Sequence, residues 1–333
     1  MENILILSAG RRVELVNCFK RAKERLNVQG NIVAADCSDL APALYFADRS
    51  VIVPRIDTGM EYVDAVIDIC NREEIGLIVP TIDTELMLLA EQKKYIERHT
   101  RAKALVSDPE IIKVCRNKTN TQEFLEEHGF KVPRMLTMEE INTGNVEFPL
   151  FIKPLDGSSS INAFKVRNEK ELFSYLELID NPMVQEFMEG VEYTIDAFLD
   201  FDSTLITLVP RIRIATRSGE IAKGKIVRDK EIAEDVGRLL KELKPIGHIT
   251  VQCMKTKRGV EYIEINPRFG GGAPMSIMAG ADSCENLYRL LRGEKLSYTE
   301  DYRANVTFLR FDSSIMLDEN LKRQRCGDES GPV

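Results

Sequence analysis

The sequence VQCMKTKRGVEYIEINPRFGGGAP, residues 251–274, contains the pattern that decides both the fold and the chemistry. Apolar stretches on either side of a turn at 257–259 predict an antiparallel hairpin. Glu264 and Asn266 are two residues apart, so they project from the same face of one strand, and the turn can bring Gln252 beside them. Oxygen ligands at this spacing suit Mg²⁺, which takes one or two carboxylates together with phosphate oxygens. The hairpin therefore predicts a metal site, with a solvated strand face as the alternative.

Two further segments near the hairpin are suited to binding anions. Arg268 can fork onto a phosphate, and the glycines at 270–272 can present backbone N–H groups to a developing oxyanion. In the basic segment RIRIATRSGEIAKGK, residues 211–225, Arg211 and Arg213 share one face of a strand and can act together on one anion. A flexible loop and a solvated basic hairpin are the respective alternatives.

A stretch of small residues, DGSSSIN at 156–162, lies between two predicted strands at 148–154 and 163–166. Small residues leave the backbone N–H groups open and allow a phosphate to come close. Lys153, on the preceding strand, is placed to neutralise an α- or β-phosphate. The segment predicts a phosphate-binding loop, with an ordinary Gly/Ser hairpin as the alternative.

Residues 1–108 alternate short apolar strands with amphipathic helices, which is typical of a doubly wound α/β domain with a parallel sheet covered on both faces. The predicted strands lie at 4–7, 32–35, 50–54, 77–80 and 104–107. The first strand–helix turn, LSAGRRVEL, has only Gly10 of the three glycines that a dinucleotide site requires, and Arg11 and Arg12 stand where a pyrophosphate would approach. A nicotinamide dehydrogenase is therefore not predicted, and Asp36 is assigned a turn or cap role in preference to ribose binding.

The rest of the chain predicts two α+β units and a tail. Residues 109–182 contain a helix with a capping box at 119–122, Thr-Asn-Thr-Gln, and the strands that flank the small-residue stretch. Residues 183–322 include a strand at 193–200, whose alternation is typical of a half-buried antiparallel strand. Residues 323–333 have almost nothing to bury and predict a disordered tail.

Composition excludes several classes of protein. The 53 acidic and 45 basic residues give a net charge of −8, which disfavours a nucleic-acid partner. The seven cysteines form no CxxC pair, so they predict neither a zinc site nor a disulfide framework but free thiols in a reducing cytosol. The apolar runs are far shorter than the roughly 20 residues that span a bilayer, and the N-terminus lacks the basic region of a signal peptide. We therefore expect a cytoplasmic protein without a membrane partner.

The order of four segments, 115–134, 148–160, 184–196 and 251–274, closely resembles the ATP-grasp superfamily. Within it, the chain is most similar to single-module proteins related to the large subunit of carbamoyl-phosphate synthase. The resemblance implies an α/β fold in which an N-terminal doubly wound, pre-ATP-grasp domain at 1–108 precedes an ATP-grasp fold of two α+β subdomains. The central lid subdomain would occupy 109–182 and the C-terminal subdomain 183–322.

The resemblance also implies a role for each matching residue. Lys118 and Lys153 match the lysines that contact the ATP phosphates, and Arg268 matches the arginine that holds the transferred phosphate. Glu192 matches the acid that binds the ribose hydroxyls. The metal ligands are matched by Gln252, Glu264 and Asn266, with Glu264 bridging two ions. The glycine-rich lid is matched by Gly157, Ser158, Ser159 and Ser160, and the adenine-binding hinge by Gln185, Glu186, Phe187 and Met188.

The activity that the resemblance implies is that of an ATP-dependent carboxylate–amine (or thiol) ligase, which forms an acyl phosphate and releases ADP and phosphate. ATP and one or two Mg²⁺ ions, or Mn²⁺ in their place, would be the cofactors, and Lys153, Arg268 and Arg213 the catalytic residues. The substrates would be small carboxylates and amines, with amino acids as the first candidates, and a homodimer is expected. Two alternatives stay open: phosphorylation of bicarbonate or carbamate without ligation, and a non-catalytic ATP-binding module.

Overall fold

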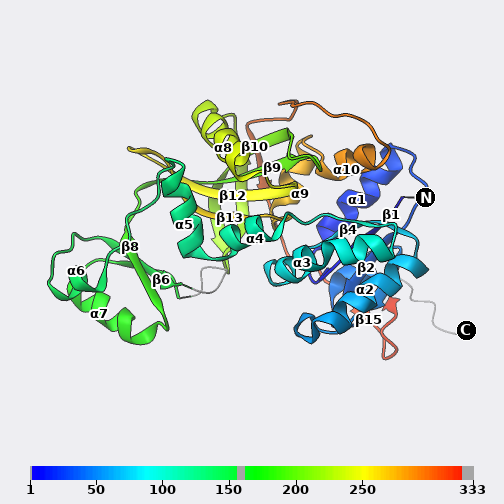
Figure 1. Ribbon diagram of the computed structural model, residues 1–333, viewed down its shortest axis with the longest axis horizontal. Coiled ribbons are helices and arrows are strands. Elements are labelled where there is room, and N and C mark those ends of the chain that lie inside the picture. The colour runs from blue at the N-terminus through cyan, green and yellow to red at the C-terminus, as the bar shows by residue number, and fades with distance from the viewer. Residues whose placement is uncertain (1, 156–161, 325–333) are drawn as a thin grey trace, which may run out of the picture.

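The structure is a computed structural model, and it describes residues 2–155 and 162–324 of the chain. These residues form sheets of five, six, three and two strands. In Figure 1 the five-stranded sheet lies at one end of the molecule, the three-stranded sheet at the other, and the six-stranded sheet between them. No helix within the described ranges is both long and apolar enough to cross a membrane.

The five-stranded sheet is parallel, with strand order β3-β2-β1-β4-β5. Its strands are β1 (Asn3–Ile6), β2 (Ile32–Asp36), β3 (Arg49–Ile52), β4 (Ile75–Val79) and β5 (Lys103–Ala104). The helices that connect them are α1 (Val13–Arg25), α2 (Met60–Arg72) and α3 (Asp83–His99), with short 3-10 turns at Pro42–Tyr45 and Ile56–Thr58. Ile4 and Ile6 pack in the core on the α1 side, whereas Leu5 packs with α2 and α3 on the other side. The predicted doubly wound sheet is confirmed, because consecutive residues of β1 alternate between two cores.

The three-stranded sheet has the order β7-β6-β8 and is antiparallel. Its elements are β6 (Leu150–Pro154), β7 (Phe164–Val166), β8 (Pro182–Glu186), α6 (Met138–Asn142) and α7 (Glu169–Leu178), and the helices α4 (Pro109–Arg116) and α5 (Lys118–Glu127) precede them in the chain. The division into 1–108, 109–182 and 183–322 stays a proposal. Because β8 pairs with β6, the small sheet continues past residue 182.

The six-stranded sheet is antiparallel, with strand order β13-β12-β9-β10-β11-β14. Its strands are β9 (Gly190–Leu199), β10 (Leu205–Arg217), β11 (Glu220–Ile226), β12 (Gly247–Thr256), β13 (Gly259–Asn266) and β14 (Val306–Leu309). Helix α8 (Lys230–Leu243) packs its apolar face on one side of this sheet. Helices α9 (Ala273–Met278) and α10 (Ser283–Leu291) follow the hairpin and share a core with α1.

The half-buried pattern predicted for the strand at 193–200 is wrong. From Tyr193 to Leu199 every residue of β9 is buried. One face packs with α8, and on the other face Phe198 joins the core formed with α1. The polar Asp196, which the sequence pattern places in solvent, is buried because it pairs with Arg211.

The predicted capping box at 119–122 is also wrong. The N-cap of α5 is Asn117, whose side-chain oxygen accepts hydrogen bonds from the backbone N–H of Thr119 at 2.9 Å and of Asn120 at 3.0 Å. Asn is as good an N-cap as Ser or Thr, so the helix begins two residues earlier than the Thr pattern indicates.

Removing this cap provides a test of the assignment. Asn117→Ala is expected to lower the free energy of unfolding by about 1 kcal/mol, because two backbone N–H groups lose their acceptor. Thr119→Ala is the matched control and is expected to change it by less than about 0.5 kcal/mol. Urea denaturation of both variants measures the difference, and a larger loss in the Thr119 variant would contradict the cap assignment.

The last described residues of the chain form a strand that pairs with a neighbouring strand. Arg323 and Gln324, predicted as the start of a disordered tail, form β16 (Arg323–Gln324), which pairs with β15 (Met316–Leu317). The Arg323 guanidinium also lies 4.2 Å from the ring centroid of Phe46. Residues 325–333 lie outside the described residues. Within residues 2–155 and 162–324, the cysteines Cys18, Cys37, Cys70, Cys115, Cys253 and Cys284 are free thiols.

Candidate active site

The hairpin of β12 and β13 brings the three predicted metal ligands together. Gln252 lies directly opposite Glu264 in the strand register, and Asn266 lies two residues further along β13. The side-chain amide of Gln252 donates a hydrogen bond to Oε1 of Glu264, and the amide of Asn266 donates to the same oxygen at 2.9 Å. The local spacing of the sequence is therefore sufficient to assemble this group.

The chemistry of this group fits Mg²⁺ that is held mainly by phosphates. It supplies one carboxylate and two amide oxygens, which are the hard oxygen ligands that this ion prefers. Among the described residues no cluster of three or more His, Cys, Asp or Glu side chains could hold a metal ion by itself. A metal at Glu264 would thus depend on oxygen ligands from a bound substrate.

Two lysines from other elements lie close to this carboxylate. Lys118, at the start of α5, donates hydrogen bonds to the carbonyl oxygens of Pro154 at 3.1 Å and Leu155 at 2.6 Å, at the end of β6. The pKa of Lys153 on β6 is lowered to about 8, first by burial and then by the positive charge of Lys118, while the negative charge of Glu264 acts in the opposite direction. Lys118, Lys153 and Glu264 therefore share one site, and an anion bound there would relieve the repulsion between the two lysines.

Arg213 and Glu192 form an ion pair on the neighbouring strands β10 and β9. Nε of Arg213 lies 2.8 Å from Oε1 of Glu192, and the guanidinium also donates to Thr194 Oγ1 at 3.3 Å and to the carbonyl of Gly219 at 3.0 Å. Burial raises the pKa of Glu192, the charge of Arg213 lowers it, and Glu264 raises it. Glu192 therefore lies between Arg213 and the metal-ligand group.

Arg211 has a different role from its neighbour on the strand face. It is buried and pairs with Asp196, so its charge is already compensated inside the protein. Its guanidinium packs under the glycine segment at 270–272, because a Cβ built on Gly272 would lie 2.7 Å from Nη2 of Arg211. Arg211 and Arg213 thus bind separate carboxylates in this structure.

Arg268 joins the hairpin to the N-terminal part of the chain. Its Nε donates to Asp83 Oδ1 at 2.9 Å and its Nη2 donates to Asp83 Oδ2, while Nη2 also lies 3.5 Å from Oδ1 of Asn266. Asp83 is the first residue of α3. The arginine therefore lies beside the metal-ligand group with its guanidinium oriented by a carboxylate from the N-terminal sheet domain.

The predicted hinge residues lie on and after β8. Gln185 is buried, and Oε1 of Glu186 accepts hydrogen bonds from the backbone N–H of Arg134 at 2.8 Å and from the guanidinium of Arg258. Nζ of Lys165 lies 3.8 Å from the ring centroid of Phe187. Met188, which follows it, is half-buried. The predicted lid residues, Gly157, Ser158, Ser159 and Ser160, lie outside the described residues.

Sequence reasoning gave Asp83 no role in this site. Asp83 follows β4, at the carboxyl edge of a parallel sheet where sites commonly form, and that position is the only signal that could have indicated it. Asp36 has the predicted turn role, since its carboxylate accepts from the backbone N–H of Gly10 at 2.8 Å and of Ser38 at 3.0 Å.

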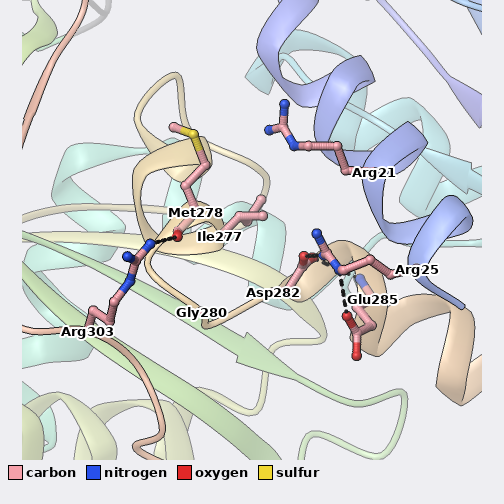
Figure 2. A pocket seen from close by; sticks show the side chains of 8 residues that line it. All are labelled: Arg21, Arg25, Ile277, Met278, Gly280, Asp282, Glu285 and Arg303. Atoms are coloured by element: carbon pink, nitrogen blue, oxygen red, sulfur yellow. Dashed lines mark hydrogen bonds and ion pairs between the residues drawn. The ribbon is translucent and has the colours of Figure 1, made fainter.

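A cavity of about 550 Å³ lies elsewhere, between α1, α9 and the start of α10 (Figure 2). Arg25 pairs there with Asp282 and Glu285, and Arg303 donates to the carbonyl of Met278 at 3.1 Å. None of the described residues that line it belongs to the predicted site. This cavity is therefore separate from the candidate active site.

Family comparisons agree with this geometry. Residues 4–101 match the family model of the PylC-like N-terminal domain, and residues 115–272 match that of the ATP-grasp domain. Together with the sheets described above, these matches define the class, and the chain belongs to the ATP-grasp superfamily. The predicted family is thereby confirmed.

Three similar proteins show the range of relatives. A carbamoyl-phosphate synthase of Methanobrevibacter smithii is 24% identical over 183 residues, 54% of this chain and 48% of that protein. A D-alanine–D-alanine ligase of Bacillus anthracis is 25% identical over 228 residues, 63% of this chain and 73% of the relative. The crystal structure of an L-amino acid ligase from Bacillus licheniformis superposes with a TM-score of 0.69 at 16% identity, covering 96% of this chain and 82% of that one. The chain thus spans about half the length of the matched synthase.

Proposed function

We propose that this protein is an ATP-dependent carboxylate–amine (or thiol) ligase that forms an acyl phosphate and releases ADP and phosphate. The observation that carries the proposal is the convergence of Lys118, Lys153 and Glu264, from three separate elements, in one site. Two lysines beside a carboxylate that can hold a metal suit the phosphates of ATP. Membership of the ATP-grasp superfamily supports the same conclusion.

In the proposed reaction, a substrate carboxylate attacks the γ-phosphoryl group in line, and ADP leaves. Lys118 and Lys153 hold the phosphates, and Arg268 counters the charge of the transferred group. Mg²⁺, held by Glu264 with Gln252 and Asn266, supplies charge neutralisation when it is bound. The amine then attacks the acyl carbon and phosphate leaves, while Arg213 and the N–H groups of 270–272 stabilise the oxyanion. The mixed anhydride makes an enzyme nucleophile unnecessary.

Amino acids are the proposed pool of substrates. The named relatives include a D-alanine–D-alanine ligase and an L-amino acid ligase, and both names describe the joining of amino acids. Phosphorylation of bicarbonate or carbamate is the second candidate, and the match to a carbamoyl-phosphate synthase favours it. A cytoplasmic location and a homodimer stay predictions from the sequence.

An ADP-release screen tests the function. The protein is incubated with Mg-ATP and pairs of amino acids, and the mass of any product is then measured. We expect ADP release that requires both partners, with a product whose mass equals that of the two substrates minus water. Release stimulated by bicarbonate alone would favour the second candidate. ATP binding without turnover across the whole panel would overturn both enzymatic candidates and favour a non-catalytic module.

The pH dependence of ATP binding tests the role of Lys153. Its protonated form is the one that attracts phosphate, and its pKa of about 8 means that it loses its charge as the pH rises through this value. The affinity for ATP is therefore expected to fall about tenfold between pH 7 and pH 9. Lys153→Arg, which stays charged, is expected to remove most of this dependence. Fluorescence titration with an ATP analogue measures it, and identical pH profiles for the two proteins would contradict the assignment.

A further inference from the structure

Three arginines meet two carboxylates where the SAGRR turn approaches the glycine segment at 270–272. We name this group the arginine cluster, and its members are Arg12, Arg268, Arg310, Asp83 and Glu220. Glu220 lies 3.4 Å from Nη1 of Arg12 and accepts a hydrogen bond from Nη1 of Arg310 at 3.0 Å, while Asp83 pairs with Arg268. The side chains of Arg12 and Arg268 are only 19% and 13% exposed. The cluster therefore has one more positive than negative charge, and within it Arg12 and Arg268 are enclosed while Arg310 and Glu220 are partly exposed.

Arg12 reaches the glycine segment itself. A Cβ built on Gly271 would lie 2.7 Å from Nη1 of Arg12 and 3.0 Å from Oε1 of Glu220. Glycine at this position therefore makes room for the guanidinium, three residues after Arg268. Burial lowers the pKa of Arg12, and the charge of Arg268 lowers it further, because Glu220 compensates only part of the positive charge. An anion placed here would stabilise both arginines.

Arg11, the residue before Arg12, is exposed to solvent, whereas Arg12 is enclosed. Arg11 is 84% exposed, and its guanidinium lies 3.9 Å from the carboxylate of Asp312, which is exposed as well. It is a solvated charge whose contribution to binding should be small. The two consecutive arginines therefore form a natural pair of test and control positions.

We propose that Arg12 binds a second, non-reacting anionic group of the acid substrate, a carboxylate or a phosphate ester. This inference rests on the proposed function and narrows it. The reacting carboxylate lies near Arg268 and the metal-ligand group, and the second group lies beside Gly271. The substrate class is therefore an acid that carries two anionic groups, and Arg12 selects it over acids that carry only one.

Hydroxylamine trapping tests this without knowledge of the amine, since hydroxylamine converts an acyl phosphate into a hydroxamate and releases phosphate. The probes are alanine and serine, with one carboxylate each, and aspartate and phosphoserine, with a second anionic group. We expect hydroxamate from aspartate or phosphoserine at a kcat/KM at least tenfold above that of alanine and serine. The preference between aspartate and phosphoserine distinguishes a carboxylate from a phosphate.

Variants then assign the preference to Arg12. Arg12→Gln is expected to raise the KM of the preferred acid about 30-fold or more, because truncating one partner of an enclosed charge pair is costly. The KM for ATP and the Tm should stay unchanged, and Arg11→Gln should change the acid KM by less than threefold. Arg12→Lys keeps the charge, so its KM for the preferred acid should lie between those of the wild type and Arg12→Gln. This variant also tests the assignment if Arg12→Gln does not fold.

Two outcomes would overturn the inference in different ways. A preference for alanine or serine, or an acid KM that Arg12→Gln leaves unchanged, would overturn it while the proposed ligase function stands. Absence of hydroxamate from every acid in the presence of Mg-ATP would overturn the proposed function and this inference together.

Discussion

ADP formation is expected to fall at least about a thousandfold when Glu264 is replaced by alanine, while the chain stays folded. Glu264 is the single carboxylate of the metal-ligand group, and Gln252 and Asn266 are neutral amides that cannot replace its charge. Its side chain is half-buried and its hydrogen bonds are to those two amides, so its loss should cost little stability. The measurement is ADP release at saturating ATP and varied Mg²⁺ concentration.

The control for this variant is Glu123→Ala. Glu123 is an exposed glutamate on α5, and its removal changes the net charge by the same amount without touching the hairpin. Circular dichroism and the Tm of both variants show whether the fold is intact. A Glu264→Ala protein that turns over ATP at the normal rate would refute the assignment of the metal ligands.

Asp196→Ala is expected to lower the free energy of unfolding by about 3–5 kcal/mol, because it leaves the buried charge of Arg211 without a partner. Arg211 is 1% exposed, and its Nε and Nη2 donate to Asp196 Oδ2 at 3.2 and 3.0 Å. Burial by itself would raise the pKa of Asp196, but the charge of Arg211 holds that pKa well below its usual value. The ionised pair is therefore the stable state inside the sheet.

Urea denaturation of three variants separates the pair from the packing around it. Asp196→Ala and Arg211→Met each break the pair, whereas the double variant Asp196→Leu/Arg211→Met removes both charges and should recover part of the loss. Asp312→Ala removes an exposed partner of Arg217 and should cost less than about 1 kcal/mol. A loss below about 1 kcal/mol for Asp196→Ala would show that the buried pair is not required for stability.

The features that could be predicted from the sequence are those that local spacing determines. Uninterrupted apolar strands such as β1 identify a parallel sheet, and two residues of separation place Glu264 and Asn266 on one face. The strand β9 was misread because polar Asp196 resembles a solvent-facing residue when its distant partner is unknown. The cap of α5 was predicted at the wrong residue because Thr119 and Gln122 match the capping-box pattern, whereas Asn117 already caps the helix two residues before Thr119.

The contacts that could not be predicted join residues far apart in the chain. Arg268 and Asp83 are 185 positions apart, and Arg12 and Glu220 are 208 positions apart. No periodicity or spacing relates such residues, because the packing of the N-terminal sheet domain on the glycine segment brings them together. The metal-ligand group on the hairpin could thus be predicted from the sequence, whereas the ion pairs that involve Asp83 and Arg12 could not.

The pairing of Arg268 with Asp83 has a consequence for modularity. A fragment restricted to the ATP-grasp segment would leave this arginine without its carboxylate, so the N-terminal part is not a detachable accessory. Chimeras that exchange N-terminal parts between relatives should work only when the donor carries an acid at the start of the helix after its fourth strand. Recombination of this chain with a relative would thus be constrained by a single carboxylate, Asp83, that lies outside the ATP-grasp segment at 115–272.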